Sequence, residues 1–274
     1  MQGKVIIATH REAKFPTDPA YLPVAVGEAG RKLPYTQDNT GRHIADRNSR
    51  YSELTALYWA WQQLASSNDW LGLVHYRRYF AATKSPRSKR TKANPSQHSL
   101  DAAILSSEEI NQLLKQYDAI VARPTRYYIE TLASHYYHTH DAHHLQVMQQ
   151  VIADLAPEYL TTYEQTLRQR QGHMYNMLIM PTDTLDAYCR WLFPILDELD
   201  QRIQATIPPG HTQSAYDQRY IGRLSELLLN VWLNHHQLEV YPCPMIYTEP
   251  VNWPRKISRF LQAKFFKRPY SDSF

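Results

Sequence analysis

An apolar run that ends abruptly in positive charge constrains the fold of this 274-residue chain more than any other segment. Residues 69–80 read DWLGLVHYRRYF, so a segment typical of a buried strand runs directly into His75, Tyr76, Arg77 and Arg78. Burying two adjacent arginines without partners is costly, so the strand must end where these cations meet carboxylates or an anionic ligand. Ligands of open α/β sheets bind at the carboxyl ends of strands, and we expect a nucleotide pyrophosphate there.

Strands alternate with helices along the chain, which predicts an α/β fold. Residues 4–9 and 22–26 are short apolar segments typical of buried strands. From Ser52 to Leu64, apolar residues recur at three- and four-residue steps, which predicts a helix with Ser52 near its cap. Because this helix lies between two strands, it predicts a βαβ unit with parallel strands. Later segments predict helices over 106–116, 128–170 (broken near Pro157), 185–203 and 220–234, strands over 117–122, 174–180 and 238–241, and loops over 38–41 and 85–100.

Composition limits the class of protein. Hydrophobic residues make up 43% and charged residues 20%, which is typical of a globular chain. Apolar runs stay well below the roughly 18 residues of a membrane span, and residues 1–15 lack the features of a signal peptide, so we expect a cytoplasmic location. Cys189 and Cys243 have no CxxC spacing, which indicates neither a disulfide framework nor a cysteine metal site.

Two segments concentrate the basic residues. The net charge of +4 is too weak to imply a nucleic-acid partner, and neither an RNP-like nor a helix-turn-helix pattern accompanies the basic segment 84–92. The tail, residues 256–274, places Phe260, Leu261 and Phe265 among cations at helical spacing. Such a tail is either a helix docked on the core or a reversible contact with an anionic membrane surface.

The chain lacks the usual glycine-rich phosphate loops, so a bound nucleotide needs another source of positive charge. Guanidinium groups match phosphate oxygens in pairs, and His75, Arg77 and Arg78 could supply this charge. The alternative is that both arginines are structural and pair with carboxylates such as Asp38 or Glu53.

Histidines crowd into residues 134–145. His140 and His144 stand one helical turn apart, as zinc ligands can, but HExxH and a third ligand are missing from the sequence. The segment therefore favours a polar helix face that lines a cleft and contacts sugar hydroxyls.

Two carboxylate patterns also allow two interpretations each. Glu226 shares one side of a predicted helix with Arg219 and Arg223, either as a general base or in a plain surface salt bridge. Asp183 and Asp186 follow Pro181 and Thr182 at a predicted helix start, which favours N-terminal capping over a metal-binding pair.

Taken in order, these segments resemble a known bacterial family. ELTALYWAW at 53–61 followed by HYRRYF at 75–80 is the most specific part of a match over about residues 4–250. The family occurs in capsular-polysaccharide, exopolysaccharide and lipopolysaccharide clusters, was long catalogued as a domain of unknown function, and is regarded as a family of glycosyltransferases. The other segments are DNTG at 38–41, YDAIVARP at 117–124, HTHDAHHL at 138–145, MYNMLIM at 174–180, YCRWLFPILDEL at 188–199 and RYIGRLSELLLNVWL at 219–233.

The resemblance implies a GT-A-like fold, a nucleotide-sugar-binding mixed α/β sheet flanked by helices. We expect one glycosyltransferase domain over residues 1–255, with a donor half at about 1–124, an acceptor half at about 125–255, and the tail at 256–274. Some relatives are said to transfer galactofuranose, so the expected donor is a UDP-sugar, with UDP-galactofuranose as one candidate. The Asp-x-Asp of metal-dependent GT-A enzymes is absent from the strand end, which reads HYRR, so we expect no cofactor, with Mn²⁺ or Mg²⁺ as the alternative.

The resemblance also implies roles for single residues. His75, Arg77 and Arg78 would stabilise the departing diphosphate, and Glu226 would be the base of an inverting displacement. The alternative is a non-catalytic nucleotide- or glycan-binding component of a polysaccharide assembly complex. Expected partners are a nucleotide-sugar donor, a glycan or lipid-linked acceptor and the inner membrane surface, but no nucleic acid. The donor-binding residues would be Thr9, His10, Gly27, Asp38, Asn39 and Tyr76, and the acceptor-binding residues His138, His140 and Asn176.

Overall fold

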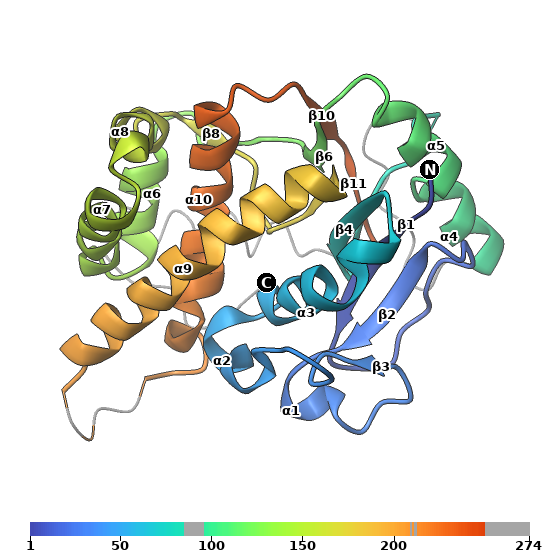
Figure 1. Cartoon of the computed structure of the whole chain (residues 1–274), viewed down its shortest axis with the longest axis horizontal. Helices are drawn as coiled ribbons and strands as arrows, with labels where there is room; N and C mark the ends of the chain where they lie inside the picture. The colour runs from blue at the N-terminus through green and yellow to red at the C-terminus, as the bar shows by residue number, and fades with distance from the viewer. Residues whose placement is uncertain (85–95, 209, 211–212, 250–274) are drawn as a thin grey trace. The chain divides into compact units, whose positions relative to one another are not determined.

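The structure is a computed structural model that describes residues 1–84, 96–208, 210 and 213–249. The described chain divides into two compact units (Figure 1). Unit 1 takes residues 1–123, 175–189 and 238–249, and unit 2 takes residues 124–174 and 190–237. The chain first leaves unit 1 after Arg123, next to the expected end of the donor half, although the assignment of donor and acceptor halves stays a prediction.

Unit 1 is built on a mixed β-sheet that has nine strands within the described residues. These are β1 (Gly3–Thr9), β2 (Tyr21–Ala25), β3 (Thr36–Gln37), β4 (Trp70–His75), β5 (Arg78–Phe80), β6 (Ala119–Ala122), β9 (Leu178–Pro181), β10 (Val240–Cys243) and β11 (Met245–Tyr247). The strand order is β10-β6-β9-β4-β1-β2-β3, with β5 paired to β4 and β11 paired to β5. Strands β4, β1, β2 and β3 run parallel, whereas β9 is antiparallel to both of its neighbours.

The centre of this sheet is buried on both faces. Val5, Ile6 and Ile7 of β1 are all fully buried, as expected of parallel strands covered on two sides. Helix α3 (Leu54–Leu64) packs against β1 and β4 (Figure 1). The predicted strands before and after this helix correspond to β2 and β4. They run parallel, as predicted, but β1 lies between them in the sheet and pairs with both. The other helices of unit 1 are α1 (Gly27–Gly30), α2 (Asn48–Tyr51), α4 (Gln97–Ala103), α5 (Ser107–Leu113) and the first part of α9 (Thr182–Thr206), with 3-10 turns η1 (Ala45–Arg47) and η2 (Ala65–Ser67).

Unit 2 is mainly helical. Helix α8 packs against α7 and α10, and a two-stranded ribbon of β7 and β8 completes the unit. Its elements are α6 (Leu132–Thr139), α7 (His143–Leu155), α8 (Leu160–Leu167), α10 (Tyr220–His235), the second part of α9, β7 (Thr125–Arg126), β8 (Gln171–Gly172), and the 3-10 turns η3 (Pro157–Tyr159) and η4 (Asp217–Arg219). The predicted α/β class, with a mixed sheet flanked by helices, is thus confirmed.

The structure corrects several predicted boundaries in unit 1. Ser52 does not cap α3, because its φ of 53° lies outside the helix and the N-cap position belongs to Glu53, without a side-chain cap bond. The predicted strand 174–180 begins only at Leu178, since left-handed backbone at Tyr175 and Asn176 interrupts it. Residues 97–100 of the predicted loop belong to α4, whose N-cap residue Ser96 accepts a hydrogen bond from the Ser99 N–H.

Two further predictions concern unit 2 and the basic segments. The predicted helix 128–170 is three helices, and it breaks at residues 140–142 as well as before Pro157. His140 is the C-cap residue of α6 and His144 lies in α7, so their predicted placement one turn apart on one helix is wrong. The tail 256–274 and most of the basic segment 84–92 lie outside the described residues. Among the helices that the structure describes, none has both the length and the apolarity needed to cross a bilayer.

Candidate functional site

The carboxyl ends of β1, β2, β3 and β4 meet at one edge of the sheet in unit 1. They do so because the four strands are parallel and in register, with Ala8 opposite His75 and Thr9 opposite Ala25. This edge therefore gathers most of the residues predicted from the sequence to bind the donor. The members are Thr9, His10, Gly27, Asp38, Asn39, His75, Tyr76 and Arg77.

Tyr76 organises the most strongly charged part of this edge. Its ring is 3% exposed, and the guanidinium carbons of Arg11 and Arg77 lie 4.7 and 5.5 Å from its centroid. The imidazoles of His10 and His75 lie 5.2 and 4.4 Å from the same ring. Because an aromatic face attracts cations, the buried tyrosine holds two guanidinium groups in place. The edge thus presents two positive charges beside two imidazole rings.

The chain reverses direction at Tyr76 and Arg77. His75 pairs antiparallel with Arg78, so Tyr76 and Arg77 form a two-residue turn between β4 and β5. The Arg77 carbonyl accepts a 3.1 Å hydrogen bond from the Thr248 N–H beside β11, which fixes the turn. Arg77 therefore lies in this turn and Arg78 begins β5, so the two arginines do not alternate along one continuous strand.

The two arginines consequently have different neighbours. Arg77 faces Tyr76, whereas the guanidinium of Arg78 lies 4.7 Å from the centroid of Tyr175. Tyr175 in turn hydrogen-bonds Tyr247, which is paired with Arg78 across β5 and β11. The ring of Tyr175 therefore contacts Arg78 and links it to Tyr247.

Glu249 is the acidic partner of the cations around Tyr76. Its carboxylate forms an ion pair with Arg11 and lies 3.9 Å from the Nη1 atom of Arg77. The glutamate is 38% exposed, so water screens both pairs. The structural alternative named Asp38 or Glu53 as partners of the arginines, and the structure shows a different carboxylate. Sequence reasoning missed both Glu249 and Arg11, although Arg11 follows β1 by two residues and could have been found as a strand-end cation.

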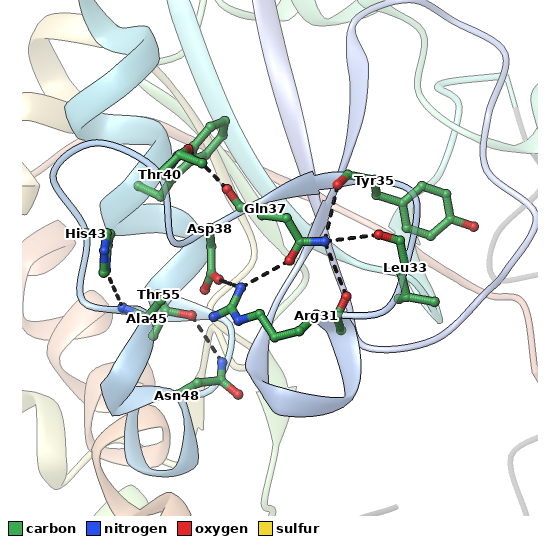
Figure 2. A network of polar contacts seen from close by, with 12 residues as sticks. Arg31, Leu33, Tyr35, Gln37, Asp38, Thr40, His43, Ala45, Asn48 and Thr55 are labelled. Atoms are coloured by element: carbon green, nitrogen blue, oxygen red, sulfur yellow. Dashed lines mark hydrogen bonds and ion pairs between the residues drawn. The ribbon is translucent and has the colours of Figure 1, made fainter.

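Asp38 belongs to a second network at the same edge (Figure 2). The carboxylate is fully buried, and its Oδ1 accepts a 2.6 Å hydrogen bond from Arg31. Gln37 accepts from Arg31 through Oε1 and donates through Nε2 to the carbonyl oxygens of Leu33 and Tyr35, which holds the loop before β3. Within the described residues, the Asp38 Oδ2 atom is buried and has no hydrogen-bond partner. A buried acceptor in this state costs free energy, and a hydroxyl or N–H group of a ligand could satisfy it.

Gly27 lies close to an amide that sequence reasoning did not identify. Its φ is 67°, and a Cβ atom at this position would come within 2.4 Å of the Asn48 Oδ1. Asn48 donates through Nδ2 to the carbonyl of Ser52. It also donates to the Thr55 hydroxyl (Figure 2), and the two bonds fix the orientation of the amide. Glycine at position 27 therefore keeps space for the Asn48 oxygen.

The remaining residues predicted to bind the sugar donor lie in different environments. The buried Thr9 hydroxyl donates a 2.6 Å hydrogen bond to the Arg11 carbonyl, so it shapes the loop after β1. Asn39 is exposed in the loop after β3.

Asn176 was predicted to bind the acceptor, and it lies in unit 1. It is almost fully buried and donates through Nδ2 to the Glu53 Oε1 at 2.9 Å. Its φ of 51°, like the 81° of Tyr175, is left-handed, and such strain is concentrated at functional sites. The pair anchors the turn before β9, next to the stacked Arg78.

The histidine-rich segment of unit 2 splits into two groups. His138 and His135 contact opposite oxygens of the buried Glu130, at 2.6 and 3.2 Å. Burial alone would raise the pKa of the Glu130 carboxyl, but the hydrogen bonds with the two histidines outweigh it and lower the pKa. His138 thus participates in an internal charge cluster.

His140 faces a different environment. Its Nδ1 lies 3.2 Å from the Arg223 Nη1, and its ring packs against Tyr136. Burial, reinforced by the charge of Arg223, lowers the pKa of His140 to about 2, so the imidazole is neutral at physiological pH. His138 and His140 therefore contact different groups of residues. His138 contacts Glu130, whereas His140 contacts Arg223 and Tyr136.

Glu226 lies half-buried on α10, one turn after Arg223. Its carboxylate stabilises the positive charge of that arginine. Arg219 is the residue before α10 and occupies its N-cap position. Arg223 itself lies over the ring of Tyr216. Both interpretations of Glu226, the general base and the surface ion pair, are compatible with this position.

Carboxylates suited to a metal ion are dispersed in the structure. Asp186 accepts a 2.8 Å hydrogen bond from the Trp61 indole, and Asp183 is exposed in the first turn of α9. Asp38 faces a guanidinium group, which disfavours a divalent cation at the same oxygen. Across the described ranges, no group of three or more His, Cys, Asp or Glu residues is arranged to hold a metal ion.

Comparisons with known proteins identify one family and one similar solved structure. The model of a protein family described as a domain of unknown function (DUF4422) matches residues 4–237. Among solved structures, the apo structure of the WbbM bifunctional glycosyltransferase is similar to this chain, with a TM-score of 0.81 and 25% sequence identity. The likeness covers 91% of this chain but 46% of that one, so this chain spans less than half of the neighbour's length. No curated protein matches.

Proposed function

The chain belongs to the DUF4422 family, and on that premise we propose that it is a glycosyltransferase of surface polysaccharide synthesis. It would move a hexose from a nucleotide-sugar donor to a glycan or lipid-linked acceptor. The observation that carries the proposal is the cationic edge of unit 1, where Arg11, Arg77 and two imidazoles surround Tyr76 at the ends of β1 and β4. The similarity to a glycosyltransferase structure supports it.

The donor in this proposal is a UDP-sugar, and UDP-galactofuranose is the first to test. The free Oδ2 of Asp38 supports a role in accepting a hydrogen bond from the nucleoside. Gly27 belongs to the same proposed set, and its missing side chain leaves space for the Asn48 oxygen. Thr9, His10, Asn39 and Tyr76 complete the proposed donor set.

Arg77 and its neighbours would hold the diphosphate. Glu249 neutralises Arg11 and Arg77 in the structure, and it is exposed enough to leave. A diphosphate carries more negative charge than one carboxylate and offers paired oxygens to the guanidinium forks, so it would displace Glu249. As the glycosidic bond breaks, these fixed cations would stabilise the charge that develops on the leaving group. His75 and Arg78 are assigned to the same task.

The transfer itself would be an inverting displacement. An acceptor hydroxyl oxygen forms a bond to the anomeric carbon, the bond from that carbon to the phosphate oxygen breaks, and the diphosphate leaves with the electron pair. The hydroxyl proton passes to Glu226, the proposed base, whose negative charge is favoured by Arg223. Asn176, His138 and His140 are the proposed acceptor contacts.

Slow hydrolysis of the donor tests this function without knowledge of the acceptor. The full chain is incubated with a panel of nucleotide sugars, and the release of free nucleotide is followed. We expect release from a UDP-sugar, lost in Arg77→Ala and kept in the matched variant Arg168→Ala, which removes an exposed arginine of unit 2. Binding of a nucleotide sugar without hydrolysis or transfer would favour the alternative, a non-catalytic component of an assembly complex. No binding to any member of the panel would contradict both.

Reversible membrane contact is a separate part of the proposal and rests on the sequence of the tail, residues 256–274. Cations beside phenylalanines favour an anionic surface, where each basic residue contributes about 1 kcal/mol. Co-sedimentation with anionic and neutral liposomes, for the full chain and for a chain truncated after Pro254, measures it. Equal pelleting of both chains would contradict the assignment of the contact to the tail.

A further inference from the structure

Unit 2 contains a cavity of about 620 Å³. Its described lining includes none of the site residues that were predicted from the sequence. The cavity lies where the β7–β8 ribbon meets the second half of α10. Its polar lining is dominated by Arg126, Arg170, Gln169, Gln171, Asn230 and Asn234. The volume falls within the range of roughly 300–1,000 Å³ typical of small-molecule sites, so the cavity can hold a saccharide.

The charge of this cavity is unbalanced. Arg126 and Arg170 are exposed, and the described residues that line the cavity include no aspartate or glutamate. Within the described residues, neither arginine forms an ion pair with a carboxylate, and Arg170 makes one 3.4 Å hydrogen bond, to the Tyr128 carbonyl. Most of the guanidinium donors therefore remain available for an anion.

The floor of the cavity is fixed before any ligand binds. Asn230 is 3% exposed, and its Oδ1 accepts a 2.7 Å hydrogen bond from the His173 N–H. Its Nδ2 donates to the carbonyl oxygens of His173 and Glu226, so each polar atom of the amide has a partner. A floor held in this way loses little entropy on binding, which favours a specific ligand.

Tyr128 presents an unusually exposed ring at the rim. Tyr128 is 76% exposed, and its backbone φ of 52° is left-handed. A turn closed by the bond from the Ile129 N–H to the Tyr127 carbonyl holds this conformation, and the Tyr127 N–H is bonded to the Arg170 carbonyl. Strained residues of this kind cluster at ligand clamps, and an amphipathic aromatic ring suits the face of a sugar.

We propose that this cavity binds an acidic saccharide, a sugar unit that carries a carboxylate or a phosphate. Arg126 and Arg170 would hold the anion, Gln169, Gln171 and Asn234 would bind hydroxyl groups, and the ring of Tyr128 would pack against the sugar. The proposal rests on the proposed function only in taking a glycan as the ligand.

Binding to the full chain, measured by calorimetry without any nucleotide, tests this proposal. The probes are glucuronic acid, glucose 1-phosphate, glucose and inorganic phosphate. We expect at least one acidic sugar to bind about tenfold or more tightly than glucose, because charge-assisted hydrogen bonds are the strong ones. The two acidic probes decide between a carboxylate and a phosphate.

Matched variants locate the site. Arg126→Ala combined with Arg170→Ala should weaken binding of the acidic sugar about tenfold or more, the expected cost of losing charged hydrogen bonds. Arg168→Ala removes a neighbouring exposed arginine outside the lining and should leave binding unchanged. Tyr128→Ala should weaken binding, and Tyr128→Phe should retain it because the ring remains.

Three results would overturn the proposal: equal affinity for glucose and the acidic sugars, unchanged binding in the double arginine variant, or an adventitious ion only, in which inorganic phosphate binds as tightly as either acidic sugar. The assay uses no donor, so its outcome is separate from that of the hydrolysis test. A chain that binds acidic sugar but hydrolyses no nucleotide sugar would refute the proposed function and leave this site standing.

Discussion

Arg77 in unit 1 and Arg223 in unit 2 both lie over a tyrosine ring, but their remaining contacts differ. Arg77 is 27% exposed, lies 5.5 Å from the centroid of Tyr76, and has a carboxylate oxygen of Glu249 at 3.9 Å. This carboxylate is itself half-exposed, and 3.9 Å is a long distance for an ion pair. The guanidinium of Arg77 can therefore exchange its partner for a ligand.

Arg223 is enclosed instead. It lies 3.7 Å from the centroid of Tyr216, donates a 2.6 Å hydrogen bond to the carbonyl of that residue, and contacts the neutral His140. Burial lowers its pKa, so its surroundings stabilise the charge less than water would. Stacking on an aromatic ring therefore does not identify a binding cation. A binding cation is identified instead by a partner that a ligand can displace.

The largest effect is expected from Arg223→Ala. The substitution leaves the carbonyl of Tyr216 without its donor and opens a space beside His140, so the free energy of unfolding should fall by about 2–4 kcal/mol. Urea denaturation measures it, with Arg168→Ala as the matched exposed control. UDP affinity should be unchanged. A loss below about 0.5 kcal/mol, the range of ordinary surface substitutions, would refute the description of Arg223 as enclosed.

Arg77→Ala should have the opposite profile. We expect UDP binding to weaken by about 1.5–3 kcal/mol, the range of a charged hydrogen bond, with little change in the unfolding transition. Arg77→Lys keeps the charge but loses the fork, so it should recover part of the affinity. Arg78→Ala is predicted to weaken UDP binding by a similar amount. Calorimetry with circular dichroism as the folding control checks both, and normal affinity in a folded Arg77→Ala variant would remove the diphosphate assignment.

Acid should destabilise the enclosed region through His140. The folded-state pKa of about 2 lies below the ordinary value of 6.5, so the unfolded chain takes up this proton first as the pH falls. The contribution of His140 to the free energy of unfolding is therefore fully present above about pH 6.5. Below that pH it decreases by up to about 1.4 kcal/mol per pH unit, which amounts to about 2 kcal/mol at pH 5. Urea denaturation of the wild type and of His140→Asn at pH 7.5, 6 and 5 isolates this contribution. Parallel pH profiles for the two proteins would show that His140 does not carry it.

Glu249→Gln should raise the affinity for UDP. The variant keeps the size of the side chain and removes the charge that competes with a diphosphate for Arg11 and Arg77. Exposed ion pairs contribute about 0.2–1 kcal/mol, which predicts a gain of up to about fivefold. Glu239→Gln, an exposed glutamate elsewhere in unit 1, is the matched control. Weaker binding in Glu249→Gln would mean that the carboxylate supports the site rather than competing with the ligand.

Chelation is expected to have no effect. If fixed cations stabilise the leaving diphosphate, activity should survive exhaustive treatment with EDTA. Nucleotide release in EDTA, compared with release in added manganese or magnesium, measures this. Complete loss that either ion restores would return Asp38, Asp183 and Asp186 to the candidate ligands.

How much the sequence predicts depends on the distance between the residues that decide each feature. The strand from Trp70 to His75 is predictable, because a run of contiguous apolar residues is buried in almost any α/β context. The reversal at Tyr76 and Arg77 is not, because neither residue favours a turn and Thr248, from the far end of the described chain, fixes it. The parallel direction of β2 and β4, the strands predicted before and after the helix, was predicted correctly, but the position of β1 between them was not.

The candidate site shows the same limit. Asp38 was identified from a local turn motif, and its partner Arg31 lies only seven residues away. Glu249 could not be predicted from the sequence, because no local pattern relates it to Arg11 or Arg77. The cavity of unit 2 could not be predicted for the same reason. Its lining comes from three separate segments, and only the fold brings them together.

The position of β9 has a consequence for how the protein is made. This strand lies between β4 and β6 in the sheet, yet the ribosome produces it only after much of unit 2. The interval of roughly 55–60 residues takes about 3–12 s at typical elongation rates of 5–20 residues per second. During that time, β4 and β6 each lack a neighbour and expose an edge that can pair with another chain. The speed of translation across residues 123–181 should therefore determine how much of the newly made chain escapes aggregation.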